Sequence, residues 1–322
     1  MVTPGGASWR RPAEHRRAGR RPVPRRVALL AGVVVLAAVP SAVWLGTGGP
    51  GGPSAGPPTP PVATAPPTPT APRPEPPRPA LVDPDPATAR AFAAVRGRLH
   101  GEVGLAWVDA DGIHRLGGLR TGAAWSTVKV PMSVAALRRP QGDTRDLVTR
   151  ALRRSDNDAA LALWTGLGGG AQAARRVDVV LDRLDSAETR TSSSVSEPPF
   201  SPYGQTRWSL TDQARFARAL TCRAPRDPVV REVLEEMAQV EPGQRWGLGG
   251  VEGARFKGGW GPGADGRYLV RQLGVVGRGG HRVAVALAAR ADSGVFADGV
   301  ADLDLLTADV VTVLADRPGY SC

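Results

Sequence analysis

Residues 125–132 read WSTVKVPM, and this short stretch decides how the rest of the chain is interpreted. If a helix begins near Ser126, then Ser126 and Lys129 lie one turn apart on the same face. A serine hydroxyl becomes an effective nucleophile when a base takes its proton, and a buried lysine with a lowered pKa can be that base. The helix N-terminus adds backbone N–H donors that favour developing negative charge. Alone, the spacing is equally typical of a serine helix cap followed by an exposed lysine.

Two further short motifs follow Ser126 along the chain. Ser155-Asp156-Asn157 lies between two predicted helices, where such residues commonly serve as helix caps. Lys257-Gly258-Gly259-Trp260 precedes a predicted strand, and its glycines would let a substrate backbone lie along a strand edge. The alternative for this second motif is an ordinary glycine-rich turn. Each motif is weak when it is considered alone.

The order of the three motifs is more informative than any one of them. In this order the chain resembles the superfamily of class A β-lactamases and penicillin-binding proteins, whose signature is S-x-x-K, S-D-N and K-T-G. Residues 102–112 (EVGLAWVDADG) look like the family's first hairpin, and residues 155–169 (SDNDAALALWTGLGG) look like its S-D-N helix. The resemblance covers most of residues 88–314. It implies a serine hydrolase that forms an acyl-enzyme with amide, β-lactam or peptidoglycan-related substrates and needs no cofactor.

The resemblance also assigns a role to each motif residue. Ser126 would attack the carbonyl, and Lys129 would act as base or proton relay. The other implied catalytic residues are Ser155 and Lys257, which would pass a proton to the leaving nitrogen and attract a substrate carboxylate. The implied substrate-binding residues are Asn157, Gly258, Gly259 and Trp260, with an oxyanion hole formed by the backbone N–H groups of Ser126 and Trp260.

Three features depart from the family pattern. Gly258 replaces the hydroxyl residue that helps bind a substrate carboxylate, and one such charged hydrogen bond contributes about 1.5–3 kcal/mol. The Glu-x-x-Leu-Asn pattern that activates the deacylating water is absent, and Glu188 and Glu197 are the acids of that type nearby. Lys129 and Ser155 are only 26 positions apart, a shorter separation than in class A enzymes. We therefore expect slow deacylation, and a degenerate, non-catalytic cell-wall or ligand-binding module is the alternative.

The predicted elements favour an α+β fold. Strands are predicted at 103–108, from 113 onward, at 268–276 and at 282–289, and helices at 88–100, 131–137, 143–153, 158–165, 171–184, 211–220 and 299–314. Strands at both ends of the domain predict one antiparallel sheet that is built from both termini, with helices on its faces and an all-helical insertion.

The first part of the chain predicts a membrane anchor. Residues 27–46 (VALLAGVVVLAAVPSAVWLG) form a 20-residue run without a charge, which is long enough to span a bilayer. Arginines concentrate before this run, so the positive-inside rule places the N-terminus in the cytoplasm and the folded domain outside. A cleaved signal peptide is the alternative. We assign 1–26 to a basic leader, 27–46 to a transmembrane helix, 47–86 to a Pro-rich linker and 87–322 to the hydrolase domain.

Charge and cysteine content indicate which ligands and cross-links to expect. The net charge of +11 could suggest nucleic-acid binding, but much of the basic excess precedes the apolar run and would face the cytoplasm without a folded domain. No Cys/His cluster suggests a metal site. Export into an oxidising compartment and an even count favour a disulfide between Cys222 and Cys322, with two separate thiols as the alternative. We expect a monomer.

Overall fold

The computed structural model describes residues 80–277 and 281–322. The predicted leader, the predicted anchor at 27–46 and most of the predicted linker lie outside these residues. Within the described part of the chain, no helix combines the length and apolar character needed to cross a membrane. Residues 80–86, which the sequence analysis assigned to the linker, join the domain: Leu81 forms a parallel bridge with Ile113, and the Val82 N–H donates to the Ile113 carbonyl at 2.8 Å.

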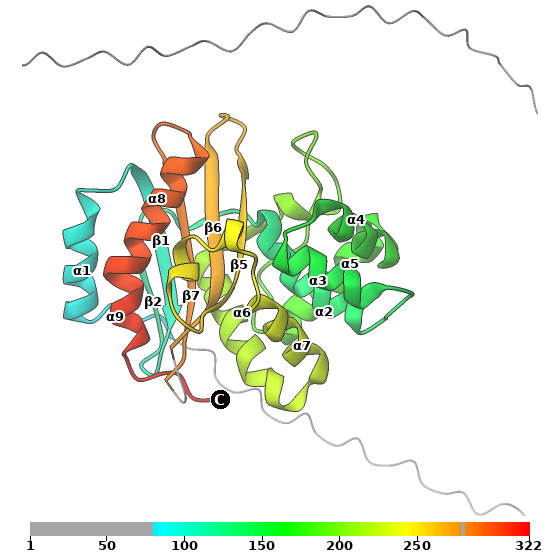
Figure 1. Cartoon of the computed structure of the whole chain (residues 1–322), viewed down its shortest axis with the longest axis horizontal. Coiled ribbons are helices and arrows are strands. Elements are labelled where there is room, and N and C mark those ends of the chain that lie inside the picture. Colours follow the sequence, from blue (N-terminus) through cyan, green and yellow to red (C-terminus); the bar gives the residue numbers. More distant parts are fainter. Residues whose placement is uncertain (1–79, 278–280) are drawn as a thin grey trace, which may run out of the picture. The chain divides into compact units, whose positions relative to one another are not determined.

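A five-stranded antiparallel sheet forms the centre of the domain (Figure 1). Its strand order is β2-β1-β7-β6-β5. The strands are β1 (Gly101–Val108), β2 (Ile113–Gly117), β5 (Arg255–Pro262), β6 (Tyr268–Val276) and β7 (Val283–Ala291). The N-terminal strand β1 pairs along its length with the C-terminal strand β7. The prediction of an antiparallel sheet built from both termini is therefore confirmed.

Helices cover both faces of this sheet (Figure 1). On one face lie α1 (Pro86–Arg96), α8 (Phe296–Leu306) and α9 (Thr312–Ala315), with the π-helical turn Thr307–Val311 joining the last two. The other face packs against α6 (Leu210–Arg223). On the face that α6 covers, a further group of helices lies beside α6. The remaining helices are α2 (Lys129–Leu137), α3 (Thr144–Arg153), α4 (Asn157–Gly166), α5 (Gly170–Arg183) and α7 (Pro228–Met237).

The sequence of β7 explains why the two faces differ. Successive strand residues point to opposite faces, so Val283, Val285 and Leu287 fill the core next to α8 and α9. The residues between them are Ala284, Ala286 and Ala288, which belong to the other core together with residues of α6. Small side chains on that face let α6 pack close to the sheet.

The elements predicted from the sequence recur within a few residues of their expected bounds. The alternative of a glycine-rich turn at 257–260 is excluded, because these residues lie inside β5. Three further elements were not predicted: α7 and the two strands of a small sheet, β3 (Thr121–Ala123) and β4 (Arg207–Ser209). Strands of three residues are too short to show a hydrophobic period.

The predicted disulfide between Cys222 and Cys322 is confirmed. It joins the end of α6 to the last residue of the chain across a sequence separation of 100. On the chain-entropy model, a closed loop of this size stabilises the fold by up to about 4–5 kcal/mol. The C-terminal segment is also held by the backbone, because the Tyr320 N–H donates to the Arg282 carbonyl at 3.1 Å.

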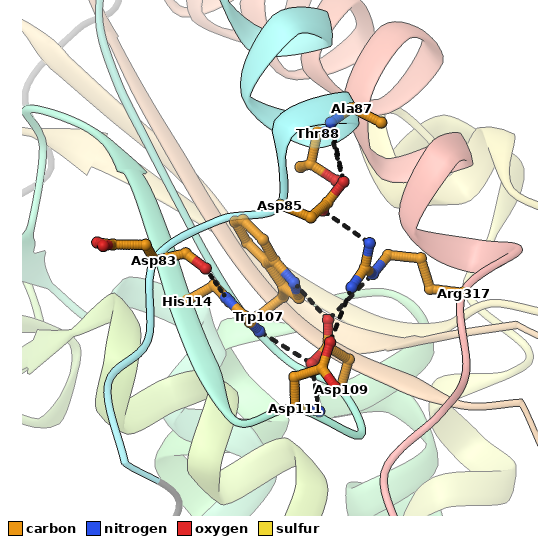
Figure 2. A network of polar contacts seen from close by, with 9 residues as sticks. All are labelled: Asp83, Asp85, Ala87, Thr88, Trp107, Asp109, Asp111, His114 and Arg317. Carbon is orange, nitrogen blue, oxygen red and sulfur yellow. Dashed lines mark hydrogen bonds and ion pairs between the residues drawn. The ribbon is translucent and has the colours of Figure 1, made fainter.

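A buried ionic cluster ties both ends of the domain to the β1–β2 hairpin (Figure 2). Asp109 Oδ1 lies 2.9 Å from His114 Nε2, and Asp109 Oδ2 accepts hydrogen bonds from Trp107 Nε1 and Arg317 Nε. His114 Nδ1 lies 3.1 Å from the carbonyl oxygen of Asp83. Because a carboxylate and a carbonyl can only accept, both ring nitrogens of His114 must donate. The side chain is therefore an imidazolium, stacked on Trp107 with ring centroids 4.8 Å apart.

Arg317 completes the cluster from the C-terminal side. Its guanidinium also pairs with Asp85 at 2.7 Å and with Asp111 at 3.1 Å. Asp85 is the N-cap of α1, since its side chain accepts from the N–H groups of Ala87 and Thr88. One arginine thus links the C-terminal segment, the start of α1 and the hairpin turn.

The ionic cluster predicts a specific pH dependence of stability. Burial would lower the pKa of His114, but the hydrogen bond to Asp109 and its negative charge outweigh burial and raise it above 6.5. Burial opposes ionisation of Asp109, yet hydrogen bonds led by that of His114 lower its pKa to about 2. The histidine contribution is complete below pH 6.5 and is lost as pH rises through the raised pKa; the aspartate contribution is complete above pH 3.8 and is lost toward pH 2.

We therefore expect His114→Gln to lower the free energy of unfolding by about 1.5–3 kcal/mol near pH 6, because it removes one of the two charged groups that donate to the buried Asp109 carboxylate and leaves only Arg317. Between pH 6 and 9 the variant should lose less stability than the wild type. Denaturant unfolding at a series of pH values measures both effects. Parallel pH profiles for the two proteins would show that His114 is not charged in the folded state.

Candidate functional site

Ser126 lies in a turn whose backbone is strained. Trp125, immediately before it, has φ of 48°, a left-handed conformation that residues other than glycine rarely adopt. Trp125 is the first residue of the 3₁₀ turn η1 (Trp125–Val128), which runs directly into α2. Such strained residues persist where the surrounding structure over-determines them, and they cluster at functional sites.

A buried polar network holds the backbone on both sides of Trp125. Arg271 in β6 donates to the carbonyl oxygens of Gly122 and Ala123, at 3.0 and 2.9 Å, and to Gln213 Oε1. Gln213 Nε2 in turn donates to Thr127 Oγ1 at 2.9 Å, and Thr127 Oγ1 donates to the Ala124 carbonyl.

Arg271 itself has no carboxylate partner among the described residues, and its burial lowers its pKa to about 9. It therefore acts mainly as a fork of hydrogen-bond donors that fixes the turn.

The glycines of β5 let this strand pack against the same turn. Residues 257, 259 and 261 point to one face of β5, and a Cβ atom at Gly259 would lie 2.8 Å from the Ser126 nitrogen and 2.9 Å from the Thr127 nitrogen. A Cβ atom at Gly261 would lie 2.6 Å from the Trp125 ring. Residues 256, 258 and 260 point to the other face, where Gly258 approaches Trp246.

Lys129 begins α2 and is almost completely buried, with an exposed fraction of 1 %. Its Nζ donates to the Ser155 carbonyl at 2.6 Å and to Asn157 Oδ1 at 2.8 Å. Burial lowers the pKa of Lys129 to about 7, and the negative charge of Asp156 opposes that shift. A substantial fraction of this amine is therefore neutral near pH 7 and able to accept a proton.

Ser155 lies between two lysine amino groups. Lys257 Nζ donates to Ser155 Oγ at 2.9 Å, and Lys129 Nζ lies 3.4 Å from the same oxygen. Lys257 is fully buried in β5, and burial first and the neighbouring Lys129 second hold its pKa well below the ordinary value. Ser155 has φ of 56°, and it is Asp156, not Ser155, that caps α4 through the N–H groups of residues 158 and 159.

These side chains face a cavity of about 500 Å³, which we call the cleft. Of the residues singled out from the sequence, Ser126, Lys129, Ser155, Asn157 and Trp260 line the cleft. Lys257, Gly258 and Gly259 lie behind this lining, within β5. The other walls are largely apolar and aromatic, formed by Leu161, Pro199, Phe200, Pro202, Tyr203, Pro262 and Tyr268.

No glutamate lines the cleft among the described residues, and Asp158 is its one lining carboxylate. Glu197, which the sequence made the first candidate for a missed base, is exposed and lines a neighbouring cavity instead. Its loop is fixed by the Gln205 side chain, which accepts from the N–H groups of Ser196 and Glu197 at 2.8 Å. In the part of the chain that the structure describes, no group of three metal-ligating side chains forms.

Sequence reasoning missed the network behind the turn, although one signal was available. Arg271 interrupts the apolar strand YLVRQLGVV (268–276), and a charge in a buried strand needs partners. Gln213 carried no such signal, because a glutamine on an amphipathic helix is usually exposed. Two aromatic residues of the cleft wall, Phe200 and Tyr203, come from a segment without a periodic pattern.

The fold is that of class A β-lactamases. A β-lactamase from Sphaerobacter thermophilus superposes with a TM-score of 0.55 at 20% identity, covering 72% of this chain and 98% of that one. A β-lactamase from Streptosporangium roseum has a TM-score of 0.52 at 18% identity, covering 70% and 99% of the two chains. A mutant of the last common ancestor of class A β-lactamases of Gram-negative bacteria has a TM-score of 0.52 at 19% identity, covering 72% and 100%. No protein-family model matches the sequence, and no curated protein does.

The contact between β5 and the turn at Ser126 predicts a large effect of one methyl group. Gly259→Ala should lower any Ser126-dependent activity by at least about 100-fold, because the added carbon meets backbone atoms that cannot rotate away. The stability cost should be about 1–3 kcal/mol. Gly250→Ala is the matched control, since a Cβ atom there meets nothing within 4 Å. Wild-type activity in a folded Gly259→Ala protein would contradict the described packing.

Proposed function

We propose that this protein is a serine hydrolase that acts through an acyl-enzyme. The observation that carries the proposal is the position of the Ser155 hydroxyl, held between the amino groups of two buried lysines in the wall of a cleft that also contains Ser126. Burial of two lysines is costly and a purely structural role would not require it. Perturbed amines in a cleft beside a serine are typical of an activated nucleophile.

The proposed reaction begins with neutral Lys129, which takes the proton of Ser126 Oγ as this oxygen attacks a carbonyl carbon. The developing oxyanion would be stabilised by the backbone N–H groups of Ser126 and Trp260. The leaving nitrogen would receive a proton through Ser155, which Lys257 holds in place. Asn157 lines the cleft beside Lys129 and can contact an amide group of the substrate.

The proposed substrates are amides of the β-lactam or peptidoglycan-related kind. The β-lactamase fold supports this class, and the apolar cleft walls suit an acyl side chain. A cleft without a glutamate favours slow release of the acyl group. This feature also keeps a second candidate function open, a non-catalytic cell-wall or ligand-binding module on the same fold.

The proposed location is outside the cytoplasm, on a single-pass membrane anchor at residues 27–46. The disulfide between Cys222 and Cys322 supports an oxidising compartment, because such bonds are rare in the cytosol. The proposed active unit is a monomer, because the nucleophile, both lysines and Ser155 all come from one chain.

The role of Lys129 predicts the pH dependence of acylation. Because only the neutral amine accepts a proton, the acylation rate should rise with pH around about 7 and level off above it. Lys129→Ala should lower this rate by about 10²–10⁴-fold, and Ser126→Ala should abolish it. Stopped-flow measurement with an activated ester gives the profile. Wild-type turnover by Ser126→Ala would show that the nucleophile is a different residue.

The missing glutamate predicts burst kinetics. With a β-lactam in excess, one equivalent of product should form rapidly and further hydrolysis should be slow, because the cleft lining offers no carboxylate of the expected type to activate water. Rapid-mixing absorbance measurements resolve the two phases. Glu197→Gln should leave the slow phase unchanged, since this side chain lies outside the cleft. Fast steady-state hydrolysis without a burst would show that another group activates water.

A further inference from the structure

A second cavity of about 590 Å³ adjoins the cleft. Its charged lining residues are Glu102, Arg120, Glu197, Arg207, Arg267 and Arg290. Trp125 and Pro262 line both the second cavity and the cleft. The Trp125 ring lies across β5 at Gly261, so one indole and one proline separate the two spaces. The two cavities are therefore direct neighbours across these two side chains.

The four arginines come from four separate segments, and two of them are already paired. Arg290 forms an ion pair with Glu102 at 2.9 Å, and Arg267 forms one with Asp265 at 2.8 Å. Neither Arg120 nor Arg207 forms an ion pair with any described residue. Glu197 is the remaining acid of the lining. Among the described residues, the second cavity thus offers two guanidinium groups without an ion pair against the one carboxylate of Glu197.

Both arginines are exposed at the small sheet β3–β4, at opposite ends of it. Arg207 lies opposite Ala123 in the pairing of β3 with β4, and its neighbour Trp208 is completely buried. Because successive strand residues alternate, Arg207 points away from the core. Arg120 is exposed at the residue before β3. The opposite face of this sheet meets Arg271, which donates to Gly122 and Trp208 carbonyls and fixes the platform.

The cleft itself offers little for a substrate carboxylate. No arginine lines it among the described residues, and it contains the Asp158 carboxylate. Lys257 is buried and already donates to Ser155 and to the Gly258 carbonyl. A side chain at position 258 would point toward Trp246 and away from Ser126. A negative group on the substrate therefore finds its complementary charge in the second cavity, not beside the lysines.

We propose that Arg120 and Arg207 bind a carboxylate on the part of the substrate that extends past Trp125, so that the enzyme selects acidic peptides. This inference rests on the proposed function, because it concerns the substrate of the same site. Guanidinium groups suit planar, bidentate recognition of carboxylates, and each charged hydrogen bond of this kind strengthens binding appreciably.

The test compares matched peptide thioesters on the full-length chain. Two pairs are used, one with glutamate or glutamine in the acyl part and one with these residues in the leaving part. The wild type should favour the glutamate member of one pair, and Arg120→Gln/Arg207→Gln should reduce that preference in kcat/KM about tenfold or more, mainly through KM. The preference should also weaken as salt is added. Arg175→Gln/Arg231→Gln removes the same charge from exposed helical positions and should leave the preference intact.

Each outcome separates the two proposals. Equal loss of preference in both double variants, or no preference for glutamate in the wild type, would overturn the carboxylate site while leaving the hydrolase proposal standing. If no thioester is cleaved, the hydrolase proposal fails. Calorimetric titration of Ser126→Ala with the same glutamate and glutamine peptides then tests the carboxylate site by itself: tighter glutamate binding that needs Arg120 and Arg207 supports it, and equal binding overturns it.

Discussion

The arrangement of the site follows from one constraint: two lysine amino groups are buried around the Ser155 hydroxyl, and burying them costs free energy. Removing a charged amine from water is expensive, and the protein lowers this cost by surrounding the amines with oxygen acceptors and by favouring their neutral forms. Lys129 Nζ has the Ser155 carbonyl and Asn157 Oδ1, while Lys257 Nζ has Ser155 Oγ and the Gly258 carbonyl. These contacts require the start of α2, the turn before α4 and the strand β5 to meet at one point. The five-stranded sheet and the helices beside it make that meeting possible.

The local rigidity of the site has a separate physical origin. Arg271, Gln213 and Thr127 fix the backbone before and after Trp125 and so stabilise its left-handed conformation. Glycine at 259 lets β5 lie directly against the same turn. The backbone at Ser126 is thus positioned by hydrogen bonds on one side and by close backbone packing on the other. Such preorganisation lowers the cost of reaching the reactive geometry.

Much of the architecture could be predicted from the sequence because its signals are local. Alternating apolar residues predicted the strands, helical spacing predicted most helices, and the order of the three motifs predicted which segments would meet. The contacts that complete the site could not be predicted, since they join distant segments. Gln213 reaches Thr127 across 86 positions, and nothing in its own helix indicates this. The second cavity likewise depends on four arginines whose proximity only the fold reveals, in a chain that is rich in arginine throughout. Glu197 lies outside the cleft because of the conformation of an irregular loop, and such a loop shows no hydrophobic periodicity from which its conformation could be predicted.

The most direct test of the account is the intact mass of the protein after exposure to benzylpenicillin, followed by peptide mapping. The arrangement of Ser126, Lys129 and Ser155 predicts a mass increase equal to one molecule of the antibiotic, located on the peptide that contains Ser126. The adduct should persist because no glutamate lines the cleft in the described part of the chain, and it should be absent from Ser126→Ala. An adduct on another residue, or an unmodified protein that also fails to react with activated esters, would contradict the claim that Ser126 is an activated nucleophile.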